Sequence, residues 1–151
     1  MTWTHIQGGS NSGANNAATV TVTAVGTNNL VAGFAQCDTF PNTGSNPPIG
    51  DWSITNNGTS TYTVVDNISD TAGNNTFGSL YTAAGTGETT ITATNSAGST
   101  NGAMILVDEF SGNNSIAALD GHAIAITTSS GSGVTLSSGN ASPATNGDLI
   151  Y

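Results

Sequence analysis

Residues 19–23, Thr19-Val20-Thr21-Val22-Thr23, alternate a threonine with a valine, and this alternation decides the fold class. Successive side chains of a β-strand point to opposite faces, so a strand here places both valines on one face and the three threonines on the other. A helical period would mix the two kinds of side chain on each face. The segment therefore predicts a strand with one face against a core and the other in water.

Similar short blocks recur at intervals of roughly ten residues, separated by turn residues, and none has the period of a helix. The run 30–35 is continuously apolar, which predicts a strand covered on both faces, and 103–107 is the most apolar run and the expected centre of the core. We expect one hairpin to join 52–54 to 62–65 through Asn56-Asn57-Gly58, and another to join 77–83 to 89–94. Further strands are expected at 3–6, 123–127, 134–136 and 148–151, a loop at 8–16 and a turn at 26–29.

About nine or ten short strands without a helix predict an all-β chain, folded as an antiparallel β-sandwich or jelly roll. We expect residues 1–151 to form a single domain, because a chain of this length can bury one core without a disulfide. A β-solenoid is the alternative, but it needs a constant short repeat, and the segments keep no fixed register of Gly or Asn. The single cysteine, Cys37, is expected to be a buried small hydrophobic residue.

The chain contains no lysine or arginine, and its nine carboxylates give it a formal charge of −9. Binding of phosphate groups depends on fixed cations, so the composition argues against nucleic-acid and nucleotide partners. No apolar stretch is long enough to insert into a membrane, and the first residues do not resemble a signal peptide. A chain rich in Gly, Ala, Ser, Thr and Asn suits an extracellular, cell-surface or virion setting, reached after removal of a leader or after release by lysis.

Three short motifs follow one another along the chain: Ile68-Ser69-Asp70-Thr71-Ala72-Gly73-Asn74, Glu109-Phe110-Ser111-Gly112 and Asn146-Gly147-Asp148-Leu149. With these motifs, residues 18–151 resemble a β-sandwich module that recurs in large bacterial extracellular and surface proteins and in phage-associated proteins. The resemblance implies a β-sandwich in a surface setting, and it implies no shared catalytic activity. Similar sequences continue well beyond the Gly-Asp-Leu motif, whereas this chain stops at Tyr151.

The last segment, Asp148-Leu149-Ile150-Tyr151, is expected to be an edge strand and the candidate assembly edge. An open strand edge is a template for pairing with another chain. We therefore expect either that the chain is a fragment or that a strand from another subunit completes the sheet. The expected partners are copies of the same chain or other structural subunits.

The 68–74 motif has two interpretations. Asp70 can bond the backbone amides that follow it and Gly73 can take a positive φ, so that Asn74 closes a tight turn without any ligand. The alternative is a calcium ion held by oxygen atoms of Asp66, Asp70 and Asn74, although the spacing lacks the alternating acids of a recognised calcium loop. Apart from this calcium alternative, we expect no metal and no cofactor.

Groups suited to catalysis are sparse. Glycoside hydrolysis needs two carboxylates across a cleft, and any chain with nine acids offers such pairs in principle. The two histidines, His5 and His122, are not accompanied by a nucleophile motif. Asp108 and Glu109 are neighbours in an expected strand and should point to opposite faces, so they are a poor pair for one ion. We therefore expect that the chain is not an enzyme.

Carbohydrate binding is the main functional alternative, because it needs planar aromatic rings surrounded by polar groups. Trp52, beside the proline-rich stretch 41–48, and Tyr62 are the candidates, and packing in the core is the competing interpretation of both. Our leading hypothesis is a non-catalytic structural protein: a virion decoration or fibre component, or a subunit of an extracellular filament or surface layer. A glycan-binding adhesion module is the alternative.

Overall fold

The computed structural model describes residues 3–38, 52–69, 75–82, 85–96 and 102–112, and at residues 38, 66–69 and 75–76 it describes the backbone only. These residues form strands and no helix, which confirms the all-β prediction for this part of the chain. The strands are β1 (Thr4–Gly13), β2 (Ala17–Thr21), β3 (Leu30–Asp38), β4 (Trp52–Asn56), β5 (Thr63–Ser69), β6 (Asn75–Thr82), β7 (Thr90–Asn95) and β8 (Gly102–Ser111). The part of the chain described contains no helix able to span a membrane.

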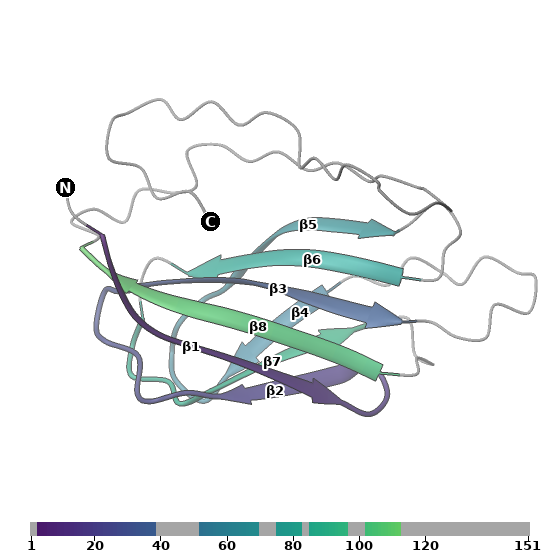
Figure 1. Cartoon of the computed structure of the whole chain (residues 1–151), viewed down its shortest axis with the longest axis horizontal. Coiled ribbons are helices and arrows are strands. Elements are labelled where there is room, and N and C mark those ends of the chain that lie inside the picture. The colour runs from purple at the N-terminus through teal and green to yellow at the C-terminus, as the bar shows by residue number, and fades with distance from the viewer. Residues whose placement is uncertain (1–2, 39–51, 70–74, 83–84, 97–101, 113–151) are drawn as a thin grey trace, which may run out of the picture.

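The eight strands form two antiparallel sheets that lie one behind the other (Figure 1). The larger sheet has the order β1-β8-β3-β6-β5, and the smaller has the order β2-β7-β4. In the larger sheet, β8 pairs with β1 and β3, so the run 103–107 lies inside a sheet as predicted. The predicted strands 123–127, 134–136 and 148–151 lie outside the described residues.

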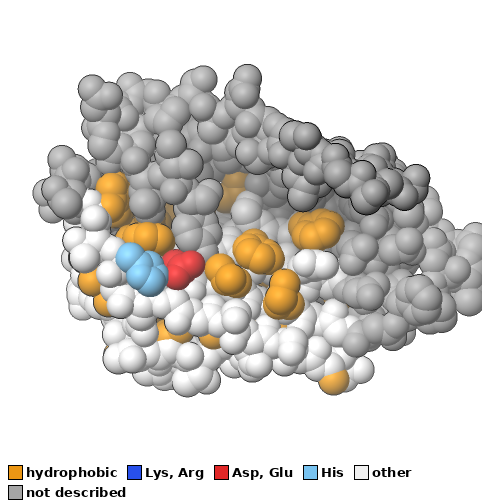
Figure 2. Space-filling view, in the orientation of Figure 1, with side chains coloured by type: hydrophobic (Ala, Val, Ile, Leu, Met, Phe, Trp, Pro, Cys, Tyr) orange, Lys and Arg blue, Asp and Glu red, His pale blue; other side chains and the backbone are white. Residues whose placement is uncertain are grey.

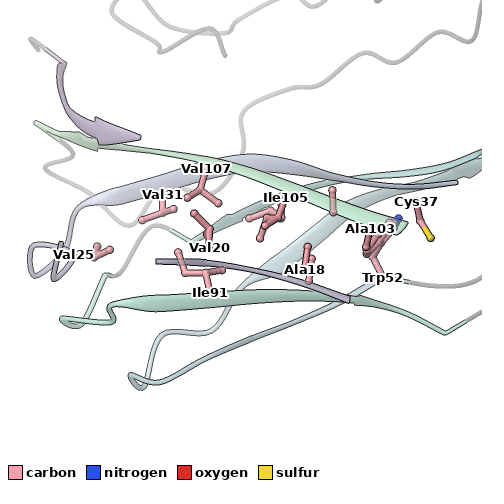
Figure 3. Close-up of a cluster of buried hydrophobic side chains, with 13 residues drawn as sticks. Ala18, Val20, Val25, Val31, Cys37, Trp52, Ile91, Ala103, Ile105 and Val107 are labelled. Atoms are coloured by element: carbon pink, nitrogen blue, oxygen red, sulfur yellow. The ribbon is translucent and has the colours of Figure 1, made fainter. Parts of the chain in front are cut away.

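The core lies between the two sheets, where alternate residues of facing strands meet (Figure 3). β2 contributes Ala18 and Val20, while Thr19 and Thr21 are exposed on the opposite face, as the alternation predicts. The remaining buried hydrophobic residues of the cluster come from both sheets and the β2–β3 connection: Val25, Val31, Ala35, Cys37, Trp52, Leu80, Ile91, Ala93, Ala103, Ile105 and Val107. Cys37 is fully buried, which confirms its predicted packing role.

Both predicted hairpins are wrong. β4 and β5 belong to different sheets, and so do β6 and β7, so the chain crosses from one sheet to the other at each connection. Asn56-Asn57-Gly58 does not take the positive φ of a hairpin turn; instead, the Asn56 side-chain oxygen accepts a hydrogen bond of 2.8 Å from the Gly58 amide. Alternation identifies a strand, but it does not identify the neighbour that the strand pairs with. Among the described strands, β5 and β6 are consecutive in sequence and pair with each other in antiparallel orientation, and residues 70–74 between them lie outside the described residues.

Two further expectations need correction. The predicted loop 8–16 is mostly strand, because β1 continues to Gly13 and pairs with β8 along most of its length. Residues 8–13 are only glycine, serine and asparagine, so this part of the strand has no apolar alternation that would reveal it, and a β-carbon on Gly8 would overlap the side chain of Asp108 on β8. The 30–35 run is not covered on both faces, since Phe34 is 37% exposed on the outer face of the larger sheet, where Figure 2 shows several apolar side chains. The turn at 26–29 is confirmed, with Asn28 at a φ of 61°.

Candidate functional site

Two glutamates are buried at one end of the fold, in a chain that has no lysine or arginine to pair with them. Glu88 precedes β7 and is 0% exposed, and Glu109 lies near the end of β8 and is 3% exposed. A buried carboxylate is costly unless it is paired or fully hydrogen-bonded. We call Glu88, Glu109 and the polar groups bonded to them the carboxylate end.

Neutral donors surround the Glu88 carboxylate. Its Oε2 atom accepts hydrogen bonds from the Ser60 hydroxyl and the Thr86 amide, each 2.8 Å long, and a weaker one of 3.3 Å from the Thr86 hydroxyl. Its Oε1 atom accepts a bond of 2.9 Å from the Tyr62 hydroxyl. Burial acts to raise the pKa of Glu88, but the hydrogen bonds from Thr86, Ser60 and Tyr62 stabilise the charged form more strongly, so the pKa is lowered.

Tyr62 responds in the opposite direction to the same contact. Its pKa is raised far above the ordinary value, first by burial and then by the hydrogen bond to Glu88 and the negative charges of Glu88 and Glu109. A phenol held neutral in this way is a permanent hydrogen-bond donor. Tyr62 therefore remains a donor to the Glu88 carboxylate at neutral and mildly alkaline pH.

The Glu109 carboxylate is held by a separate set of neutral donors. Oε1 accepts bonds from the Gly26 amide, at 2.8 Å, and from the Asn29 side-chain amide, at 2.6 Å, both in the β2–β3 connection. Oε2 accepts a bond of 2.5 Å from Gln7 on β1. As predicted, Asp108 points to the other face, where its Oδ1 lies 2.7 Å from His5 Nε2 on the outer surface (Figure 2).

Gln7 extends this network to Thr23, two residues beyond the end of β2. Its side-chain oxygen accepts from the Thr23 amide at 2.9 Å, and its side-chain nitrogen donates to the Thr23 carbonyl at 2.8 Å. Asn11, also on β1, donates a bond of 2.7 Å to the Thr19 carbonyl. Because β1 and β2 are edge strands of different sheets, these two side chains join the sheets along one side of the molecule.

The hydrogen bonds of the carboxylate end join segments that are far apart in the chain. Glu109 of β8 holds the β2–β3 connection at Gly26 and Asn29, and Glu88, in the segment before β7, holds Ser60 and Tyr62 of the β4–β5 connection. The apolar hollow that Glu109 borders with Gln7 leaves no space for a water molecule. Among the described residues, no group of three or more metal-binding side chains comes together.

The outer face of the smaller sheet carries a second feature, a regular array of hydroxyl groups. In register, Thr19 of β2, Thr92 of β7 and Thr55 of β4 form one row across the three strands. The hydroxyls of Thr19 and Thr92 lie 2.7 Å apart and share a hydrogen bond. We call the seven outward side chains of these strands that carry a hydroxyl the threonine face: Thr19, Thr21, Ser53, Thr55, Thr90, Thr92 and Thr94.

Most of the predicted site residues are not brought together. Trp52 is 5% exposed and packs in the core cluster, and the prediction that it takes part in a glycan site stays a prediction. Tyr62 is committed to Glu88. Asp66 lies on β5, and only the backbone of this residue is described. Asp70, Asn74 and the assembly edge Asp148, Leu149, Ile150 and Tyr151 lie outside the described residues, so the calcium and edge-strand predictions stay predictions.

The sequence contained one signal that points to the buried position of Glu109. Ala103, Ile105 and Val107 share a face of β8, and the same period of two places Glu109 on that inward face. Glu88 has no such signal, because its partners Ser60 and Tyr62 come from a connection 26 to 28 residues away. Comparison with protein-family models, curated proteins and solved structures found no match.

Proposed function

We propose that this chain is a non-catalytic structural subunit, displayed outside the cell in a virion or an extracellular filament, and that its two sheets form a β-sandwich. The carboxylate end is the observation that carries the proposal. Glu88 and Glu109, the acids best placed to do chemistry inside the fold, accept hydrogen bonds from neutral groups that hold the connections in place. The arrangement of these hydrogen bonds supports a structural role for both glutamates.

The surface chemistry supports the same proposal. Hydroxyl and amide side chains, such as those of Thr19, Thr92 and Asn11, replace the ion pairs that most soluble proteins carry on their surface. Ion pairs at a surface weaken as salt concentration rises, while hydrogen bonds between neutral groups are not screened in this way. A subunit of this kind is suited to environments of variable ionic strength.

The edges of the two sheets favour assembly on one side of the molecule. On the side of β1 and β2, the side-chain amides of Gln7 and Asn11 bond backbone groups of residues 23 and 19, which opposes strand addition at those positions. On the opposite side, β4 is the outer strand of the smaller sheet and pairs with β7 along its inner edge. We propose that a strand of a neighbouring subunit, from the same chain or another structural protein, is added at β4.

A charged residue on an edge strand opposes strand addition, which gives the test. Ser53→Lys on β4 should disrupt assembly, whereas Ser10→Lys, an exposed serine on β1 at the other side of the molecule, is the matched control. Sedimentation velocity and negative-stain electron microscopy should show assemblies for the wild type and the control, and mainly monomers for Ser53→Lys. A wild type that stays monomeric at high concentration would contradict the proposal. The burial of Trp52 favours this proposal over the alternative of a carbohydrate-binding adhesion module.

A further inference from the structure

The threonine face is a two-dimensional grid. Its rows follow the register: Thr19 with Thr92 and Thr55, Thr94 with Ser53, and Thr21 with Thr90. Side chains two residues apart in a strand are about 6.8 Å apart, and neighbouring strands are about 4.8 Å apart. The hydroxyl groups therefore repeat in two directions with short, regular spacings.

The grid is held in place before any ligand arrives. Threonine is stiff about χ1 because its β-carbon is branched, and the bond between the Thr19 and Thr92 hydroxyls restrains both side chains further. On the other face of the same strands, Val20, Ile91 and Ala93 are buried in the core, which fixes the backbone beneath the grid. A preformed surface of this kind loses little conformational freedom on binding.

The chemistry of the grid limits the class of ligand that it can bind. None of the seven side chains is ionisable or aromatic, so the face offers neither the cations that phosphates need nor the rings on which sugars stack. Three strands of five or six residues span only about 10 Å by 14–17 Å between outer atoms. A stable protein partner usually needs about 800 Å² on each side, which is several times larger.

What remains is a ligand that is itself periodic, uncharged and able both to donate and to accept hydrogen bonds. We infer that the threonine face binds the surface of crystalline water. Each hydroxyl can donate and accept, as each water molecule of ice does, and each threonine methyl orders the water around it. Ordered first-shell waters bridge polar groups at little cost, so a grid of fixed hydroxyls can hold a water layer that joins a growing crystal. A charged side chain within the grid would keep its own hydration shell and interrupt this layer.

The test measures how much protein enters slowly grown ice, with thermal hysteresis as a second readout. The variant is Thr92→Tyr, at the centre of the grid, and the control is Thr63→Tyr, an exposed strand threonine of the larger sheet. Tyrosine favours strands, so both variants should fold, which circular dichroism checks. If Thr92→Tyr does not fold, Thr92→Val replaces it, since it removes the hydroxyl and keeps the shape.

We expect the wild type and Thr63→Tyr to be incorporated into ice, and Thr92→Tyr to be incorporated about tenfold less, which corresponds to about 1.4 kcal/mol. The inference would be overturned if ice excluded the wild type to the same extent as it excludes an unrelated soluble protein. Equal losses in the two tyrosine variants, or retention of the wild type on crystalline chitin or cellulose but not on ice, would overturn it as well. The inference does not depend on assembly at β4, because Thr92 lies on the central strand of the sheet.

Discussion

Replacing Glu88 by glutamine tests the interpretation of the carboxylate end. The substitution keeps the shape of the side chain and removes its charge. The Ser60 hydroxyl and the Thr86 amide can still donate to the remaining oxygen. The new NH₂ group faces Tyr62, whose hydroxyl now donates to Oε1 and would have to turn and accept.

The expected loss of stability follows from these contacts. Hydrogen bonds to a charged group contribute about 1.5–3 kcal/mol and neutral ones about 0.5–1.5 kcal/mol, so weakening three bonds costs roughly 3 kcal/mol. The neutral amide is easier to bury than a carboxylate, which offsets part of this loss. We expect Glu88→Gln to lower the free energy of unfolding by about 2 kcal/mol at neutral pH, or the melting temperature by roughly 4–8 °C.

The pH dependence makes the test specific. The folded-state pKa of Glu88 is lowered, so its contribution to stability is complete above the ordinary carboxyl pKa and is lost as the pH falls through the folded value. Urea unfolding, followed by tryptophan fluorescence, should show a gap between wild type and Glu88→Gln that is largest at neutral pH and shrinks in acid. Asp108→Asn, at a partly exposed acid beside His5, is the control and should cost little. A variant as stable as the wild type at neutral pH, or a gap that does not change with pH, would refute the reasoning.

Three further predictions concern Tyr62, Gly33 and Cys37. Tyr62→Phe should lower the free energy of unfolding by about 1.5–3 kcal/mol. In an alkaline absorbance titration, the wild type should show one phenol that ionises only when the protein unfolds, and the variant should lack it. A wild type in which every phenol titrates normally would be incompatible with the contact between Tyr62 and Glu88. Gly33→Ala should lower the free energy of unfolding, measured by denaturant titration, by about 2 kcal/mol or more, because the new β-carbon would overlap the Leu106 carbonyl oxygen. Unchanged stability would contradict the close packing of β3 against β8 at this position. Cys37, fully buried, should react with a thiol reagent only at the rate of unfolding, and rapid reaction of the native protein would contradict its placement.

The elements of this fold were easier to predict than their arrangement. Residues 19–23 carry the alternation that makes β2, and 103–107 form the centre of β8, because both patterns depend on neighbours in sequence. Pairing depends on residues far apart, so Asn56-Asn57-Gly58 suggested a hairpin where the chain in fact changes sheets. The sequence predicts the start of β1 at residues 3–6, but it predicts a loop where the strand continues to Gly13, because residues 8–13 contain only glycine, serine and asparagine and show no apolar alternation.

The polar sites were likewise predictable only where they depend on local sequence. Thr19 and Thr21 were placed on the outer face by alternation alone, but the row they form with β7 and β4 depends on register, which no local pattern specifies. Glu88 stood out only as one of nine acids, and Glu109 only as part of a short motif and as the neighbour of Asp108. Their burial depends on Ser60, Tyr62 and the other donors, which reach them across the fold.

The most direct test of the proposed role is electron cryomicroscopy of the wild-type assemblies at a resolution that separates strands. We expect an additional strand, contributed by a neighbouring subunit, along the outer edge of β4, and no added strand on the β1 and β2 side, where Gln7 and Asn11 bond the backbone. Subunits that contact one another only through the β1 and β2 side, or particles that contain a single isolated chain, would contradict it.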